Sequence, residues 1–251
     1  MIVTFTGTGE ACDPQRRNSS ILLETAGCRY LLDCGFSSGA VSFSGADQAP
    51  LTSVWFSHFH GDHFFGIPQL LLMLYTQKRA APLTILSGTD CREILYHTIN
   101  LAYPGLTEKL PFPLMFIQLS PGRPKAHQGL LWQAVPVAHT AEAFALRVSD
   151  RYHSLYYSGD GKPTTESMDL MRGCTLVIHE AFSYKPTDPG HGSIDECLQL
   201  AAQLALPRLA LIHINRETRA MLDRGEKNIQ TPPGTELFIP EDGETVILQA
   251  P

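Results

Sequence analysis

The stretch FSHFHGDHFFG, residues 56–66, places three of the ten histidines and an aspartate within six positions. Histidine nitrogens and carboxylate oxygens are the ligands that zinc and similar divalent ions take in proteins. His58 and His60 can point to one side of a turn, and Asp62 with His63 can face a second point nearby. Chance clustering on a solvated loop is the alternative, but it does not account for so dense a group. The stretch therefore predicts a site that can serve two metal ions, directly after a short apolar strand.

The partners of this cluster are expected far away in the sequence, because several strand-like runs end near a residue that can bind metal. Such runs precede His58, His139, Asp160 and His213, and they are Val54–Phe56, Val135–Val137, Leu155–Tyr157 and Leu209–Ile212. Strand ends can converge on one edge of a sheet sandwich. Ligands that are scattered along the chain would then meet in space.

Short strand-like runs alternate with helical runs along the whole chain. Apolar alternation and turn signals predict strands over 2–8, 20–35 (a hairpin turning at Gly27), 53–58, 83–88, 114–120, 130–139, 143–150, 154–160, 174–182, 208–214, 235–240 and 244–249. Apolar periodicity and capping residues predict helices over 66–79, 89–103, 164–173, 193–205 and 217–225. No linker stands out, so we expect a single domain over residues 1–251. Two mixed sheets covered by helices on the outside fit this order of elements.

Composition narrows the class of protein. The chain has 251 residues and a formal net charge of −6, which argues against a broad nonspecific nucleic-acid surface but leaves room for a local basic patch. Its six cysteines form no C-x-x-C pair, so we expect free thiols in a reducing compartment. Membrane-spanning runs and a signal-peptide pattern are both missing from the sequence, so we expect a soluble, cytoplasmic protein.

The order of motifs resembles that of the metallo-β-lactamase fold, and most closely its ribonuclease Z-like branch. FSHFHGDHFFGIPQLL is similar to the family's H-x-H-x-D-H metal motif, and LLDCG is similar to its second-strand aspartate motif. Other similar stretches follow in the family's order, namely VPVAHTAEAFALRV, YSGDGKP, LVIHEAF, GHGSIDECLQLA and LALIHINRE. The resemblance runs nearly end to end. It implies an α/β fold, an αββα sandwich of two mixed β-sheets flanked by helices.

The resemblance also implies two divalent metal ions, zinc or alternatively manganese. The implied ligands of one ion are His58, His60 and His139, those of the other are Asp62, His63 and His213, and the implied bridge is Asp160. A hydroxide that bridges two such ions would have a strongly lowered pKa, since zinc-bound water titrates near roughly 7 rather than 15.7. Such a centre would supply a nucleophile at neutral pH, which predicts a metal-dependent hydrolase.

Further residues are expected beside the ions. Asp33, in LLDCG, would orient a ligand histidine, although a turn-capping role fits the local sequence equally well. By the resemblance, His191 would donate a proton to the leaving group and Glu180 would orient His191; Asp62 is counted with them as catalytic. The family's serine after this histidine is replaced here by Gly192.

The substrate is expected to be a small or cyclic phosphodiester rather than tRNA. Short ribonuclease Z enzymes carry a tRNA-gripping arm between the equivalents of His139 and Asp160, but here Asp160 follows His139 by only 21 positions. A ribonuclease Z-type tRNA 3'-end endonuclease, an arylsulfatase or lactonase on the same scaffold, and a non-catalytic binding protein are the alternatives. The resemblance also suggests a homodimer.

Four other residues are assigned no part in the site. The basic residues Arg16, Arg17 and Lys162 lie in loops that could approach a substrate phosphate, but we expect them to be solvated surface charges. His179 falls inside a buried strand and is expected to be a core histidine with satisfied hydrogen bonds.

Overall fold

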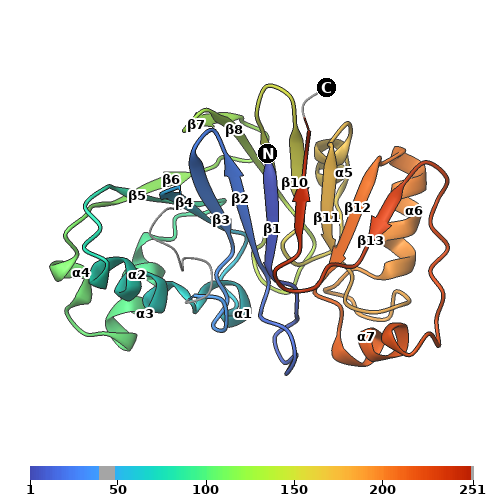
Figure 1. The fold of residues 1–251 in the computed structure, drawn as a ribbon, viewed down its shortest axis with the longest axis horizontal. Helices are drawn as coiled ribbons and strands as arrows, with labels where there is room; N and C mark the ends of the chain where they lie inside the picture. Colours follow the sequence, from blue (N-terminus) through green and yellow to red (C-terminus); the bar gives the residue numbers. More distant parts are fainter. Residues whose placement is uncertain (40–48, 250–251) are drawn as a thin grey trace.

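Two β-sheets face each other and helices cover their outer sides (Figure 1). The structure is a computed structural model and describes residues 1–39 and 49–249. The strands are β1 Ile2–Gly7, β2 Ser20–Thr25, β3 Cys28–Leu32, β4 Leu51–Phe56, β5 Leu83–Ser87, β6 Leu114–Gln118, β7 Lys125–His127, β8 Leu130–Pro136, β9 Phe144–Ser149, β10 Ser154–Tyr157, β11 Leu176–Glu180, β12 Arg208–Ile212, β13 Glu236–Phe238 and β14 Thr245–Ile247. The helices are α1 Gly61–Phe64, α2 Ile67–Thr76, α3 Arg92–Ala102, α4 Leu106–Lys109, α5 Thr165–Met171, α6 Ile194–Leu204 and α7 Arg216–Asp223.

Each sheet is mixed and has seven strands, in the orders β14-β1-β2-β3-β4-β5-β6 and β13-β12-β11-β10-β9-β8-β7. In the first sheet the strands from β14 to β3 are antiparallel, and those from β3 to β6 are parallel. The second sheet is antiparallel from β7 to β10 and parallel from β10 to β13. This architecture confirms the predicted αββα sandwich.

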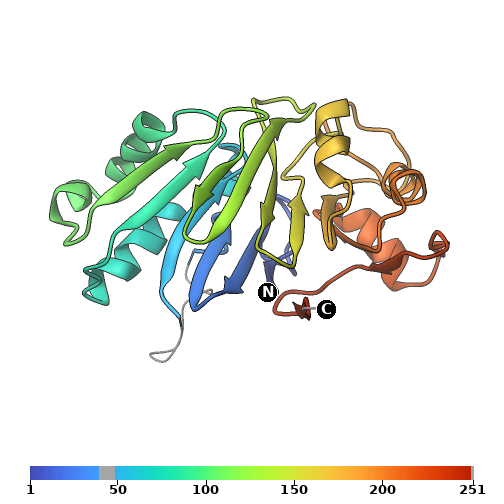
Figure 2. The same cartoon turned by 90° about the horizontal axis from the view of Figure 1, so that it is seen from above.

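The core consists of one apolar layer between the sheets and one under the helices on each outer side. Strand β4 shows why, because Trp55 packs into the central layer while Val54 and Phe56 pack under α2 and α3. Tyr30 of the first sheet and Trp132 of the second meet in the central layer with ring centroids 5.6 Å apart. Figure 2 shows the helices on the two outer faces. Strands buried on both faces explain the continuous apolar runs in the sequence.

Most predicted elements are present, and the exceptions lie in short segments. Thr164 caps α5 in a capping box with Ser167, and the Ser193 side chain caps α6. The turn predicted to carry residues 58–63 includes the one-turn helix α1, in which the Phe64 N–H donates to the His60 carbonyl at 3.0 Å. Helix α4 was not predicted. Among the described residues, no helix is both long enough and apolar enough to cross a membrane.

Candidate metal centre

The predicted ligands meet at one edge of the sandwich, where strands of both sheets end. The residues that follow β4 of the first sheet are His58, His60, Asp62 and His63, and those that follow β8, β10 and β12 of the second sheet are His139, Asp160 and His213. The side chains form two groups in which the potential ligand atoms lie within 4.8 Å of one another. The structure thus brings together every side chain that was predicted to bind metal, while their role as ligands stays a prediction.

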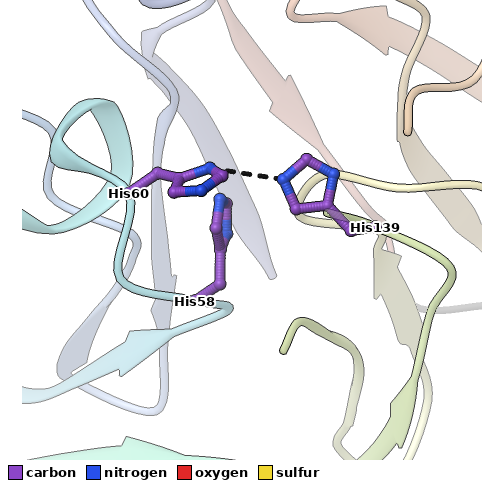
Figure 3. A group of neighbouring side chains, drawn as sticks. All are labelled: His58, His60 and His139. Atoms are coloured by element: carbon purple, nitrogen blue, oxygen red, sulfur yellow. Dashed lines mark hydrogen bonds between the residues drawn. The ribbon is translucent and has the colours of Figure 1, made fainter. Parts of the chain in front are cut away.

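Three imidazole rings face one another in the first group (Figure 3). Nε2 of His139 lies 3.3 Å from Nδ1 of His60. The ring of His58 lies beneath them, with its centroid 4.7 Å from that of His60 and 5.0 Å from that of His139. His58 is buried, and the other two rings are half-buried. Three nitrogens that converge in this way can bind one divalent ion and leave a position open.

Two carboxylates and two imidazoles form the second group, and all four side chains are buried. His213 Nε2 lies 3.2 Å from Asp62 Oδ2 and 3.3 Å from Asp160 Oδ2. His63 Nε2 lies 3.2 Å from Asp160 Oδ1. The Asp160 carboxylate also approaches the first group, since its Oδ2 atom lies 4.0 Å from His58 Nε2. Asp160 therefore stands between the two groups, where a bridging ligand has to be.

The charges of the cluster fit divalent ions. Burial opposes ionisation of Asp62, but the hydrogen bond from His213 and the charge of His63 outweigh it and lower the pKa of Asp62 to about 2. Burial also opposes a charge on His63, yet Asp160 and Asp33 raise the pKa of its imidazole well above the usual value. In His58 burial dominates and lowers the pKa of the imidazole well below its usual value, which favours the neutral ring. The ionised carboxylates thus favour protonated imidazoles, and metal cations can replace these protons.

Several atoms that face the centre lack a hydrogen bond. Buried His58 Nε2, His63 Nε2 and Asp160 Oδ1 have no hydrogen-bond partner among the described residues. The last two are only 3.2 Å apart but do not form a hydrogen bond with acceptable geometry. Ligands of a shared ion approach one another in this way. Histidine nitrogens and carboxylate oxygens are also the donors that zinc prefers, so the residues present fit two divalent ions.

The Asp33 carboxylate contacts the predicted ligand His63 on the side of the ring away from the cluster, as expected from the sequence. It is fully buried and accepts hydrogen bonds from the Ser57 backbone N–H and hydroxyl, both at 2.7 Å. It also accepts from His63 Nδ1 at 2.7 Å and from the Tyr157 hydroxyl at 2.6 Å. Donation from Nδ1 leaves His63 Nε2 free to face the centre, which fixes the tautomer that a metal requires. Sequence reasoning missed Ser57 and Tyr157, and only their positions one residue before His58 and three residues before Asp160 could have pointed to them.

The Glu180 carboxylate holds a second assembly beside the cluster. It is fully buried, and its Oε1 atom accepts hydrogen bonds from Gly161 N–H at 2.9 Å, Gly192 N–H at 2.8 Å and His191 Nδ1 at 3.2 Å. Burial opposes a charge on His191, but Glu180 and Asp160 outweigh it and raise the pKa of the imidazole to about 9. Bound cations would lower this pKa again by repulsion. His191 therefore lies next to the cluster with its Nδ1 atom held by Glu180, and its role as a proton donor stays a prediction.

Gly192, where the family has a serine, takes part in this assembly through its backbone. A Cβ atom at this position would lie 3.2 Å from the Glu180 carbonyl oxygen, which is a tight contact. The following Ser193 is fully buried and accepts a hydrogen bond from Glu196 N–H as the cap of α6. The departure from the family pattern therefore leaves the contact between His191 and Glu180 intact.

The basic loop residues lie outside the cluster, and one expectation about them is wrong. The side chain of Arg16 is only 12% exposed and pairs with Glu241, Asp13 and Asp223, so it is not a solvated charge. Lys162 Nζ lies 3.7 Å from Glu196. The sequence alone could not predict the ion pair between Arg16 and Glu241, because the two residues are far apart in the sequence.

Among the described residues, only one of the two ring nitrogens of His179 has a hydrogen-bond partner. It is buried, and its Nδ1 lies 2.7 Å from the Glu180 carbonyl oxygen, to which it donates. Its Nε2 has no hydrogen-bond partner among the described residues, so the expectation of a fully satisfied core histidine is wrong for this atom.

Metal binding near neutral pH is expected to release protons from the cluster. The carboxylates raise the pKa of His63 and His213 above 6.5, against the effect of burial, so an ion has to displace protons from these rings. We expect zinc titrations in buffers of different ionisation enthalpy to show proton release, which decreases as the pH rises. The affinity for zinc is expected to fall as the pH falls. Binding that releases no protons at neutral pH would contradict the assignment of these ligands.

Comparison with known proteins identifies the family. The model of the β-lactamase superfamily domain matches residues 28–214, which include all seven predicted ligands. The chain belongs to the metallo-β-lactamase superfamily. The predicted metal-dependent hydrolase is confirmed at the level of this family, and divalent metal binding is a property of its fold.

Several individual proteins that are similar to this chain are named ribonuclease Z or have a metallo-β-lactamase fold. It is 24% identical to ribonuclease Z of Natronomonas pharaonis, over 305 aligned positions that cover 99% of this chain and 98% of that protein. The human short-form tRNase Z, ELAC1, has a similar structure with a TM-score of 0.80 at 22% identity, covering 99% of this chain and all of that one. YhfI of Bacillus subtilis, a metallo-β-lactamase fold protein, has a TM-score of 0.78 at 21% identity and 98% coverage of both chains.

Proposed function

We propose that this chain is a dinuclear metal-dependent phosphodiesterase. The observation that carries the proposal is the position of His191, whose Nδ1 lies 3.2 Å from Glu180 Oε1 and 3.9 Å from Asp160 Oδ2. A proton donor at the rim of a metal cluster suits a reaction that expels an alkoxide. When bound, the two ions, zinc or manganese, supply a nucleophile at neutral pH and offset the charge of the phosphate.

The side chains beside the cluster would each have a separate role in this reaction. Glu180 accepts from Nδ1 of His191, which leaves Nε2 to give its proton to the leaving oxygen. Phe182 stacks on the His191 ring with centroids 4.6 Å apart, and His213 stacks at 5.5 Å. These contacts restrict rotation of the donor ring. Asp33 keeps His63 in the tautomer that binds metal, so the two assemblies act on different parts of the reaction.

RNA is the first substrate class to test. Curated relatives that match 86% to 99% of this chain are named ribonuclease Z, and their names favour a tRNA 3'-end endonuclease. The preference for a small phosphodiester, which rested on the missing arm, has no support from these relatives. The alignment with the Natronomonas protein spans 305 positions against 251 residues here, so that relative carries residues without a counterpart in this chain.

A small or cyclic phosphodiester is the second candidate, and one structural observation favours it. Strands β9 and β10 are joined by residues 150–153 alone, in a tight turn where Asp150 accepts from Tyr152 N–H and His153 N–H, both at 2.7 Å. The interval that carries the arm in short ribonuclease Z enzymes is therefore a plain hairpin. A large folded RNA has no arm to grip it at this place.

A substrate panel with and without metal tests the proposal. We expect the zinc-loaded or manganese-loaded protein to hydrolyse bis(4-nitrophenyl) phosphate, to lose this activity with a chelator, and to regain it when metal returns. Precursor tRNA with a 3' trailer, cyclic nucleotides, an aryl sulfate and a lactone complete the panel. Trailer cleavage would support the endonuclease, and turnover of cyclic nucleotides alone would support the small substrate. A fully metallated protein that hydrolyses no phosphodiester would refute the proposed function.

A further inference from the structure

The backbone of the proposed ligand His213 adopts an unusual conformation. Its φ angle is +52°, in the left-handed region that residues with a side chain rarely enter. Such a conformation persists only where the surroundings hold it. The His213 N–H donates to the Thr8 carbonyl oxygen at 2.9 Å, which ties this turn to the loop after β1. The position of the imidazole at the cluster therefore depends on where Thr8 lies.

Thr8 is in turn held by one carboxylate from the C-terminal part of the chain. Its backbone N–H and its hydroxyl both donate to Asp242 Oδ1, at 2.9 and 3.0 Å. Asp242 Oδ2 accepts from the Arg17 backbone N–H at 2.8 Å, so both oxygens are engaged. Thr8 is 3% exposed and the Asp242 side chain is 17% exposed. A single side chain thus fixes two parts of the loop that supports His213.

We propose that Asp242 is a positioning residue for the metal centre, acting on His213 through Thr8. The inference rests on the proposed role of His213 as a ligand. The competing explanation is that Asp242 only fastens the C-terminal segment to the rest of the fold. Its neighbour Glu241 separates the two, because Glu241 pairs with Arg16 and Arg219 and so fastens the same segment, but among the described residues it forms no hydrogen bond with Thr8.

The matched variants are Asp242→Asn and Glu241→Gln, both of which keep the shape of the side chain. In Asp242→Asn an amide NH2 faces one of the N–H donors, so the loop loses a hydrogen bond and gains a repulsive contact. We expect this variant to bind the weaker of two zinc ions about tenfold less tightly, since residues that orient ligands typically contribute 10–100-fold. In the metal-free protein we expect faster hydrogen exchange in residues 209–215 but not in α3. Glu241→Gln is expected to lower thermal stability and to leave both measurements unchanged.

The outcomes separate this inference from the proposed function. If Asp242→Asn binds zinc and exchanges hydrogen like the wild type, or if Glu241→Gln shows the same losses, Asp242 has no positioning role. If Asp242→Asn fails to fold, Thr8→Val takes its place, since it removes the hydroxyl bond to Asp242 Oδ1 and keeps the N–H bond. Zinc affinity and hydrogen exchange in residues 209–215 that both stay at the wild-type level in that variant overturn the inference. If the wild type binds no zinc, the ligand assignment fails, while the exchange comparison still tests the link from Asp242 to His213.

Discussion

Asp160→Ala is expected to lose most metal and nearly all phosphodiesterase activity. Its carboxylate lies 3.2 Å from His63, 3.3 Å from His213 and 4.0 Å from His58, and without it two cations would face each other with no carboxylate to offset their repulsion. Metal ions contribute several kcal/mol of transition-state stabilisation. Because about 1.4 kcal/mol corresponds to a tenfold change in rate, we expect kcat/KM to fall by about 10³-fold or more. Metal analysis and the kinetics of an activated aryl phosphodiester measure both effects.

Asp150→Ala is the matched control for this variant. Asp150 accepts two backbone hydrogen bonds in the turn between β9 and β10, at the opposite end of β10 from Asp160. Loss of its carboxylate is expected to lower stability without changing the metal content. An Asp160→Ala protein with two ions per chain and wild-type kinetics would show that the cluster is not the active centre.

His191→Ala is expected to slow turnover without releasing metal. General acid catalysis contributes about 10²–10⁴-fold, so kcat is expected to fall by this factor for a substrate whose leaving group is an alcohol. A 4-nitrophenolate leaving group needs no proton, and its kcat is expected to fall far less. Glu180→Gln is expected to act in the same direction more weakly, because the lost carboxylate no longer raises the pKa of the imidazole.

The control for this prediction is His97→Ala, on the exposed face of α3. Its kinetics are expected to equal those of the wild type with both substrates. Equal losses with both leaving groups in His191→Ala would mean that His191 positions the substrate or the metal instead of donating a proton.

Much of the site was predictable because its polar residues come directly after the ends of apolar strands. Phe56, Tyr157 and Ile212 each end a buried strand, and a predicted metal ligand follows each within three positions. An apolar run ending in such a residue is visible in the sequence, and parallel strands align their ends in space. The dense motif at residues 58–63 then identifies the edge at which they meet.

The supporting contacts were not predictable, because they join parts of the chain that sequence patterns do not connect. The Tyr157 hydroxyl reaches Asp33 across 124 positions, and Thr8 reaches Asp242 across 234. Neither residue differs locally from an ordinary strand or loop residue. Arg16 is similar, since only the folded chain brings Glu241 close enough to pair with it. Sequence patterns also miss short helices such as α1, because a single helical turn is too short to show an apolar periodicity.

The seven candidate ligands are divided between the two sheets, with four after β4 and three after strands of the opposite sheet. Cations held between them would therefore also act as a cross-link that closes one end of the sandwich. A ligand that binds only the folded state stabilises it by about 2.7 kcal/mol at a concentration one hundred times its dissociation constant. The supply of metal would then govern how long the folded protein persists as well as how fast it turns over.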